Sequence, residues 1–265
     1  MVIHIVEGES GCQETVEREA IAVVVDAMRT SATLPWMFER GAREILVVSG
    51  LSEVHALRED HPDALLAGEF GGARITGFDL GNSPHELKSM ESAGLKDRVV
   101  IFSSSAGSRR LVQAGKAPEV YVGSPVNARR VAVHVARRAA ETGRDVALIA
   151  AGHPERGVAT PEDYWAATYL ASILPLELSP AARQIYDKYI DDLISGGLGK
   201  LYRTSPSAKR LQKLGFEDDV PLCSAVNTCR SVPTAAGCFE VPGGGAGVTL
   251  RPLDMADYWL HASMV

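Results

Sequence analysis

Polar side chains that suit the binding of an anion follow the apolar run Ile21–Val25. Asp26 comes directly after this run, and Arg29 lies three positions further on. Three hydroxyl side chains then stand where a helical pattern begins: Thr30, Ser31 and Thr33. The free N–H groups and the dipole of a helix N-terminus attract phosphate, and an arginine can donate to two phosphate oxygens at once. We interpret the segment either as a site for an anion held with a metal ion, or as a plain strand end followed by N-capping residues.

A second group of candidates lies in the connection Gly68–Leu87, which reads GEFGGARITGFDLGNSPHEL. It carries the acids Glu69 and Asp79 and has glycines at positions 68, 71, 72, 77 and 81. An ordered connection of this length is usually functional, and glycines let the backbone come close to a ligand. Asn82 and Ser83 stand where an N-cap is expected, just before the next helix. The alternative is a surface excursion with incidental acids.

A third group follows three further apolar runs. The turn SSSAGS at 103–108 forms a second candidate anion cradle through Ser104, Ser105, Gly107 and Ser108. Plain N-capping is the alternative for this turn, although capping needs only one serine. The remaining candidates come after the runs at 119–122 and 145–150: Ser124, Asn127, His153, Glu155 and Asp163.

The elements that must position these residues alternate along the chain. Apolar runs predict strands at 2–6, 21–25, 44–48, 64–67, 99–102, 119–122 and 145–150. Amphipathic stretches predict helices at 34–40, 51–59, 84–90, 128–141 and 161–174, and one that ends at 114. This alternation predicts an α/β fold, namely a three-layer α/β/α architecture with a mainly parallel sheet. Ligands bind at the carboxyl ends of parallel strands, so the polar groups after residues 25, 67, 102, 122 and 151 are expected to converge on one edge.

Other stretches carry less specific signals. Glu7–Gln13 is expected to be a loop, and residues 176–220 are expected to be helical. Lys209, Arg210 and Lys213 are interpreted as a solvated helix face. The glycine-rich segment from Pro233 onwards is either a terminal strand pair or a loose tail.

We expect one α/β domain over residues 1–265, with two intertwined halves at about 1–90 and 91–265 as the alternative. Residues 23–50 resemble residues 99–124, since each stretch reads as a strand, a hydroxyl-rich turn, a helix and another strand. Such a pattern is typical of two ordinary βαβ units as well as of an internal duplication of βαβ units, and we favour the duplication.

Composition excludes several classes of protein. The net charge of −6 argues against nucleic acid as a partner, and no apolar run is long enough to span a membrane. The first eleven residues lack the basic and apolar regions of a signal peptide. The four cysteines form no CxxC pair, so free thiols and a cytoplasmic location are expected. A homodimer is left open as the oligomeric state.

Taken together, these stretches resemble the 2-phosphosulfolactate phosphatase family over nearly the whole chain. The resemblance rests on six motifs: VDAMRTSAT (25–33), GEFGGARITGFDLGNSP (68–84), SSSAGS (103–108), VGSPVNA (122–128), AGHPERGVATPED (151–163) and LGFEDDVPLC (214–223). The GFDLGNSP stretch is the most specific of them. The resemblance implies a magnesium-dependent phosphatase that removes phosphate from 2-phospho-3-sulfolactate on the coenzyme M route. It also implies an α/β fold distinct from the haloacid dehalogenase type.

The chain departs from the family pattern at three positions. Ala106 stands where the family turn usually has asparagine, and Asn227 stands near a position that often carries aspartate. Thr30 replaces the commoner alanine. These differences keep a phosphate site in place and leave open another small phosphorylated acid as the substrate.

We therefore predict hydrolysis of a phosphomonoester, with Asp26, Arg29, Glu69 and Asp79 as the catalytic residues. One Mg²⁺ is expected to draw one to three ligands from the acids Asp26, Glu69, Asp79, Glu155 and Asp163. Substrate binding is assigned to a polar set: Thr30, Ser31, Thr33, Asn82, Ser83, Ser104, Ser105, Gly107, Ser108, Ser124 and Asn127. The attacking group is either metal-bound water or an acid such as Asp26, and His153 is considered as a proton donor to the leaving oxygen.

Two rival functions belong to other classes. One is a non-catalytic anion-binding protein of the same fold. The other is a nucleotide-dependent transferase, against which stands the absence of GxxxxGK[ST] and GxGxxG motifs.

Overall fold

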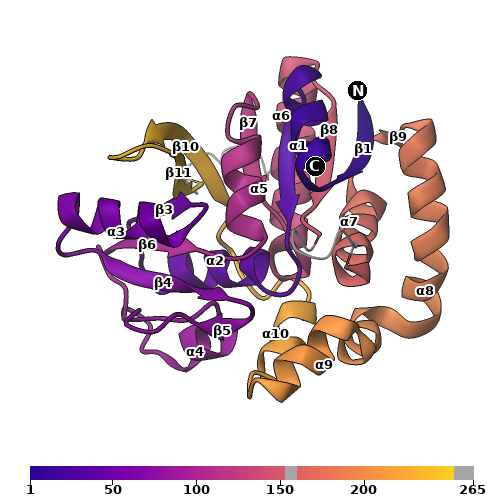
Figure 1. The fold of residues 1–265 in the computed structure, drawn as a ribbon. Coiled ribbons are helices and arrows are strands. Elements are labelled where there is room, and N and C mark those ends of the chain that lie inside the picture. The colour runs from indigo at the N-terminus through magenta and orange to yellow at the C-terminus, as the bar shows by residue number, and fades with distance from the viewer. Residues whose placement is uncertain (153–159, 254–265) are drawn as a thin grey trace.

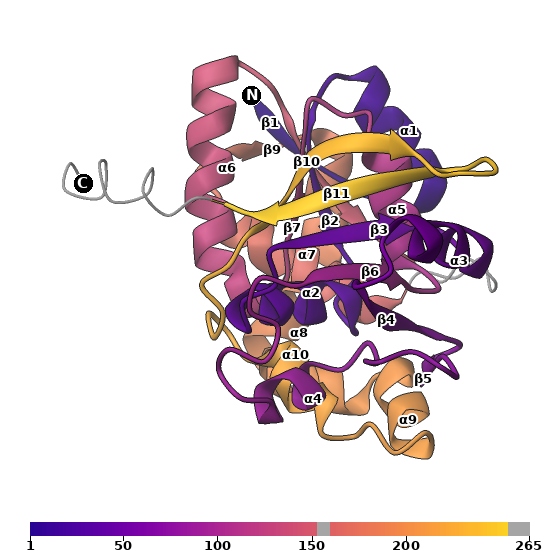
Figure 2. The ribbon, with the colours of Figure 1, turned by 90° about the vertical axis from the view of Figure 1, so that its left-hand side faces the viewer.

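The computed structural model describes residues 1–152 and 160–253. In this part of the chain, eleven strands form one sheet in the order β5-β4-β6-β3-β11-β10-β7-β2-β8-β1-β9 (Figures 1 and 2). The strands are β1 (Val2–Glu7), β2 (Ile21–Val25), β3 (Glu44–Val48), β4 (Leu65–Phe70), β5 (Ala73–Arg74), β6 (Val99–Ser103), β7 (Glu119–Val122), β8 (Val146–Ala150), β9 (Glu177–Leu178), β10 (Pro233–Glu240) and β11 (Ala246–Pro252).

Helices connect these strands and cover the sheet. They are α1 (Gly8–Glu17), α2 (Thr30–Glu39), α3 (Leu51–Asp60), α4 (Pro84–Ser89), α5 (Gly107–Ala114), α6 (Ala128–Thr142), α7 (Pro161–Ile173), α8 (Pro180–Thr204), α9 (Pro206–Lys213), α10 (Asp219–Ser224) and the short 3₁₀ helix η1 (Pro125–Asn127). None of the helices in the described ranges combines the length and the apolar composition of a membrane span.

The sheet consists of two parallel blocks joined by an antiparallel hairpin. The first block is β4-β6-β3, and the second is β7-β2-β8-β1-β9. Between them, β11 runs antiparallel to β3, and β10 meets β7 through the single pair Thr234 and Tyr121. The predicted α/β fold with a large, mainly parallel sheet flanked by helices is confirmed. The segment from Pro233 forms a strand pair rather than a loose tail, and its place at the centre of the sheet was not predicted.

Two crossover units connect the blocks in opposite directions. The chain runs from β2 in the second block through α2 to β3 in the first, and from β6 in the first block through α5 to β7 in the second. Both helices therefore lie between the blocks, and Figure 1 shows α5 at the centre of the molecule. Leu34 of α2 and Leu111 of α5 share one core cluster with Val24 of the second block and Val47 and Phe102 of the first. The sheet thus curves around a shared interior layer of helices.

The outer faces of the two blocks are covered separately. Val131 of α6 and Leu170 of α7 pack in the cluster of the second block, while Leu57 of α3 packs against the first. Helix α8 runs beside α7 and bends at Gly197, whose φ of 66° and ψ of 154° are not helical. After this bend the chain continues into α9 and α10, which lie at the lower end of the molecule in Figure 1.

The structure corrects two local expectations. Glu7–Gln13 was predicted to be a loop, but Gly8–Glu17 is a helix. The segment has few apolar residues, yet it buries Gly11, Cys12 and Thr15, and a Cβ at Gly11 would lie only 3.0 Å from Val6. Close packing of small residues hides this helix from a hydrophobic-pattern search. Strand β4 also continues to Phe70, so the beginning of the predicted long connection belongs to the sheet.

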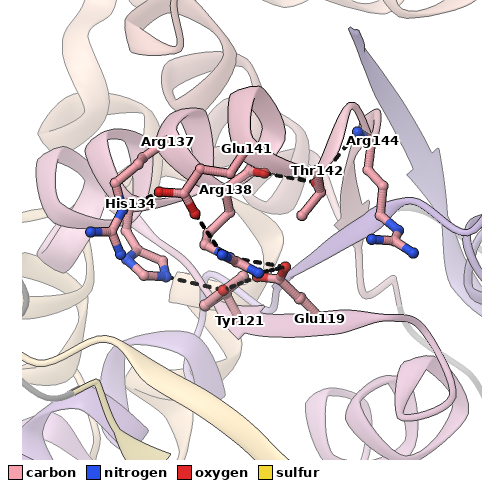
Figure 3. Close-up of polar contacts among 8 residues, drawn as sticks. All are labelled: Glu119, Tyr121, His134, Arg137, Arg138, Glu141, Thr142 and Arg144. Atoms are coloured by element: carbon pink, nitrogen blue, oxygen red, sulfur yellow. Dashed lines mark hydrogen bonds and ion pairs between the residues drawn. The ribbon is translucent and has the colours of Figure 1, made fainter.

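A partly buried polar cluster fixes the end of α6 to the beginning of β7 (Figure 3). Arg138 donates to both oxygens of Glu119 at 2.8 to 3.0 Å, and Tyr121 donates to the same carboxylate. Nε2 of His134 lies 3.0 Å from the hydroxyl oxygen of Tyr121, and His134 is 7 % exposed. Burial lowers the pKa of His134 to about 4, so its imidazole is neutral at pH 7.

Candidate active site

A small pocket of about 80 Å³ lies where the carboxyl ends of β2, β4 and β6 come together. Its walls come from segments distant in sequence: Asp26, Met28, Arg29, Glu69, Gly71, Gly72, Asn82, Ser105, Ala106, Gly152, Thr160, Asp163, Ser207, Arg210 and Leu211. The last three belong to α9, which therefore closes the pocket on one side. Four of the five strand ends predicted to converge contribute to it, those of β2, β4, β6 and β8.

Asp26 and Glu69 are brought together as predicted, and both carboxylates are held by backbone amides. The N–H of Gly107 donates to Asp26 Oδ2 at 2.9 Å, and the N–H of Ser105 donates to Glu69 Oε1 at 2.7 Å. Burial raises the pKa of Asp26, and the negative charge of Glu69 adds to this effect, while hydrogen bonds from Thr30 and Gly107 oppose it. The N-terminal turn of α5 thus binds two of the protein's own carboxylates, whereas the sequence predicted an anion cradle for a ligand.

Asp163 supplies a third carboxylate to the same pocket. It accepts hydrogen bonds from the N–H groups of Ala27 at 2.8 Å and Gly152 at 3.0 Å. Burial raises its pKa well above the usual range, and the charges of Asp26 and Glu162 act in the same direction. The pocket therefore brings together three carboxyl groups, and burial and mutual repulsion disfavour the charged forms of Asp26 and Asp163.

Arg29 lines the pocket, but its guanidinium is also engaged within the protein. Nη1 donates to Asp219 Oδ2 at 2.7 Å, and both side chains are 2 % exposed or less. Nη2 donates to the carbonyl oxygen of Gly72 at 2.5 Å, and the ring of Phe216 lies 4.5 Å from the guanidinium carbon. The two terminal nitrogens that were expected to donate to two phosphate oxygens thus donate to protein groups in this structure.

Two contributors were missed by the sequence prediction. Arg210 lines the pocket and donates to the carbonyl oxygen of Gly71 at 2.6 Å, so assigning it to a solvated face was wrong. Asp219 was not singled out, although it lies in the motif LGFEDDVPLC and is followed by apolar Val220. An acid at the start of an apolar helical segment was the available signal for it.

Several predicted hydroxyls form a buried chain behind Asp26. Asn82 Nδ2 donates to Thr30 Oγ1 at 3.2 Å, and Thr30 Oγ1 lies 3.0 Å from Ser104 Oγ. Ser104 Oγ in turn accepts from the N–H of Ser108 at 3.0 Å. This chain ties the turns after β2 and β6 together. The other end of the Asn82 amide, Oδ1, is buried without a hydrogen-bond partner among the described residues.

Other predicted binding residues are not among those that line the pocket. Ser31 accepts from the N–H of Asp26, and Thr33 donates to the carbonyl of Arg29. Ser83 donates to Asp219 at 2.6 Å. Ser124 and Asn127 stabilise the turn after β7. These side chains support the site by fixing backbone segments. The other predicted binding residues outside the lining are Thr30, Ser104, Gly107 and Ser108.

Asp79 is not brought to the pocket. Its carboxylate is exposed and accepts from the N–H of Leu66 at 2.8 Å. The backbone explains this placement, because the N–H groups of Asp79 and Leu80 both donate to the Leu66 carbonyl and direct the side chain outwards. His153 and Glu155 lie outside the described residues. Within the described ranges, no three histidine, cysteine or acidic side chains form a group that could hold a metal ion.

Comparison with known proteins places the chain in a family. Residues 8–237 match the family model described as 2-phosphosulpholactate phosphatase. A protein of Deinococcus radiodurans named "Probable 2-phosphosulfolactate phosphatase" is 32% identical over 227 residues, which cover 84% of this chain and 91% of that protein. A protein of Carboxydothermus hydrogenoformans with the same name is 34% identical over 215 residues, covering 80% of this chain and 84% of the other. With a match that spans most of its length, the chain belongs to the 2-phosphosulpholactate phosphatase family.

Proposed function

We propose that the pocket around Asp26 hydrolyses the phosphate monoester of a small acid, and that 2-phosphosulfolactate is this substrate. The observation that carries the proposal is the meeting of Asp26, Glu69 and Asp163 with Arg29 and Arg210 in one small pocket. Acids combined with arginines suit a dianionic phosphate bound together with a cation. The family name supports the choice of substrate.

The oxygen donors of the pocket fit Mg²⁺. Within residues 1–152 and 160–253, Asn82 Oδ1 is buried with no hydrogen-bond partner, which is the condition expected of an atom that binds a ligand, an ion or water. Mg²⁺ prefers hard oxygen donors, usually one or two carboxylates together with waters and phosphate. Asp26 and Glu69, with Asn82 beside them, would hold such an ion, which would offset the repulsion between phosphate and the acids. Asp163 is the further acid of the predicted set that lines this pocket.

The side chains of this chain would orient the ester for attack. Arg29 and Arg210 would neutralise charge on the phosphoryl oxygens, and the small volume would exclude bulk water. Hydrolysis adds water across the ester: the water oxygen joins phosphorus, the P–O bond to the alcohol breaks, and the alcohol oxygen receives a proton. The amides of Ser105 and Gly107 hold Glu69 and Asp26 in place throughout.

Phosphate release from 2-phosphosulfolactate tests the proposal, with and without Mg²⁺ after treatment with EDTA. We expect turnover to disappear without the metal and to return with it. We expect Glu69→Gln to lower kcat/KM at least 100-fold, or about 2.7 kcal/mol. Asp79→Asn is the matched control, because it removes an acid of the same segment that lies outside the pocket. Undiminished turnover after EDTA, or equal loss in both variants, would contradict the proposed site.

A second assay defines the substrate. 2-Phospholactate carries the same phosphate and carboxylate but lacks the sulfonate. A much higher kcat/KM for 2-phosphosulfolactate supports it as the substrate, whereas equal values assign the pocket to another small phosphorylated acid. The expected cytoplasmic location and homodimer stay predictions.

A further inference from the structure

A larger cavity, separate from the pocket around Asp26, lies at the carboxyl end of β1. Its volume is about 490 Å³, and it is bounded by α1, α5, α7 and α8. The lining includes Glu7, Gly8, Ser10, Arg110 and Tyr164. Gly152 is the residue that this cavity shares with the pocket around Asp26.

Arg110 brings to the cavity a positive charge that forms no ion pair with any described residue. The residue is 6 % exposed, and Nε and Nη1 donate to the carbonyl of Ala151 at 2.9 Å and to Gln113 Oε1 at 2.5 Å. Among the described residues no acid pairs with it, and Nη2 has no hydrogen-bond acceptor. Nη2 is absent from the fully buried atoms that lack a partner, so its surface is accessible from the cavity. A buried charge without a counter-ion is costly, and this one is fixed in position by its two other nitrogens.

The N-terminus of α1 faces the same space. A Cβ built on Gly8 would meet one group within 4 Å, Arg110 Nη2 at 3.9 Å, so the beginning of the helix and the free guanidinium nitrogen are neighbours. The side chain at the N-cap, Glu7, makes no capping hydrogen bond. The first N–H groups of an α-helix have no acceptor within the helix, and the helix dipole adds partial positive charge there.

The two acids that line the cavity are engaged elsewhere. Glu7 Oε2 accepts from the hydroxyl of Tyr164 at 2.8 Å, and Glu14 pairs with Arg18 at 2.9 Å. Among the described residues, Arg110 and the N-terminus of α1 are the positive groups of the cavity that have no ion-pair partner. Both attract negative charge.

We propose that this cavity is a second anion-binding site, which takes a small oxyanion between Arg110 Nη2 and the first turn of α1. Phosphate and carboxylate share the required chemistry, since each offers several oxygens to N–H donors. The site is independent of hydrolysis in the pocket around Asp26, because neither Arg110 nor α1 lines that pocket.

Amide NMR of the whole chain, labelled with ¹⁵N and held at constant ionic strength, tests the site directly. Inorganic phosphate is one probe and acetate is the other. We expect saturable chemical-shift changes of the Gly8, Ser10 and Gly11 amides with one or both probes. A response to phosphate alone indicates a site for dianions. A response to both probes indicates a site that also accepts carboxylates. Shifts confined to Ser105 and Gly107 would place binding in the other pocket and overturn this inference without touching the proposed function.

Two variants sharpen the test. Arg110→Gln should weaken the binding at least about tenfold. Ser10→Glu places a negative charge at the exposed first turn of α1, where it favours the helix but repels an anion, so the affinity should fall at least about fivefold. Ser52→Glu adds the same charge to the exposed first turn of α3 and is the matched control. Unchanged affinity in Ser10→Glu, or equal loss in Ser52→Glu, would overturn the site even if Arg110→Gln fails to fold.

Discussion

The guanidinium of Arg29 is enclosed by groups from three distant parts of the chain. Asp219 at the start of α10 pairs with it, and the same carboxylate accepts from Ser83 Oγ at 2.6 Å and from the N–H of His85 at 3.0 Å. One buried ion pair therefore connects α2, α4 and α10. A change to Arg29 is therefore expected to act on the fold as well as on the phosphate binding proposed for this pocket.

Loss of the ion pair between Arg29 and Asp219 should reduce the stability of the protein. Asp219→Asn should lower the free energy of unfolding by about 3 kcal/mol, since it leaves a buried arginine without a counter-ion. In Arg29→Met/Asp219→Asn neither charge remains, so the double variant should lose less than the sum of the two single variants. Urea denaturation measures all three. Asp218→Asn, an exposed neighbour, should stay within about 0.5 kcal/mol of wild type, and additive losses would show that the pair does not couple.

His134 predicts a pH dependence of stability. Its pKa is about 4 in the folded protein and about 6.5 in the unfolded chain, so the unfolded chain binds more protons between these values. The stabilising effect is fully present above pH 6.5 and is lost as the pH falls towards 4, by at most about 3 kcal/mol. His134→Gln should flatten this part of the profile in urea unfolding at pH 7, 5.5 and 4.5. Val133→Gln, an exposed neighbour on α6, should keep the wild-type profile.

At the scale of elements, α5 uses its N-terminus in an unexpected way. The sequence predicted that the serine turn before it would bind a ligand anion. In the structure, the amides of Ser105 and Gly107 bind Glu69 and Asp26 instead. A Cβ on Gly107 would lie 2.5 Å from Asp26 Oδ2, which explains why a glycine is needed at this close approach. The N-terminal turn of α5 thus positions two acids of the pocket.

Two glycines of α8 should respond in opposite directions to the same substitution. Gly197 has a φ of 66°, so Gly197→Ala should destabilise the protein by more than about 1 kcal/mol. Gly199 lies in the helical part after the bend, where a Cβ would meet Arg203 at an ordinary 3.5 Å. Gly199→Ala should therefore raise stability by up to about 1 kcal/mol through helix propensity. Thermal unfolding followed by circular dichroism measures both, and shifts of equal sign would show that the bend at Gly197 is not required.

For the whole molecule, the hairpin β10–β11 is predicted to be essential because it joins the two blocks. Leu250 is fully buried between them, so Leu250→Ala should cost about 2 to 5 kcal/mol of unfolding free energy. The hairpin is exposed near its tip, and Ala246→Ser at the start of β11 should have a smaller effect. Guanidinium denaturation compares the two. A loss at Leu250 no larger than at Ala246 would mean that the hairpin is peripheral.

Local patterns predicted much of this molecule. The strand Ile21–Val25 was assigned correctly, because a buried parallel strand is encoded by consecutive apolar residues. The polar residues that follow it in sequence placed Asp26 at the carboxyl end of this strand. Glu69 lies in the same pocket as Asp26, as predicted, because it stands at the carboxyl end of β4. These inferences needed only a short segment and the general rule that parallel strands share one carboxyl edge.

Long-range pairing could not be predicted in the same way. Arg29 and Asp219 are 190 residues apart, and nothing local to either residue indicates the other. Asp79 was placed in the site by composition, but backbone hydrogen bonds to Leu66 direct it outwards. The central position of β10 and β11 depends on the open edges of β3 and β7, which are themselves set by the two crossovers. Each miss reflects a contact made between elements rather than within one.

The hairpin at the centre of the sheet also has a consequence for how the protein is made. A ribosome produces β10 and β11 after every other described strand. Until residues 233–252 emerge, β3 and β7 each present an unpaired edge of the kind that invites aggregation. The nascent chain must therefore be protected late in synthesis, and a product that stops before residue 233 is expected to be degraded as a misfolded chain rather than to persist as a partial enzyme.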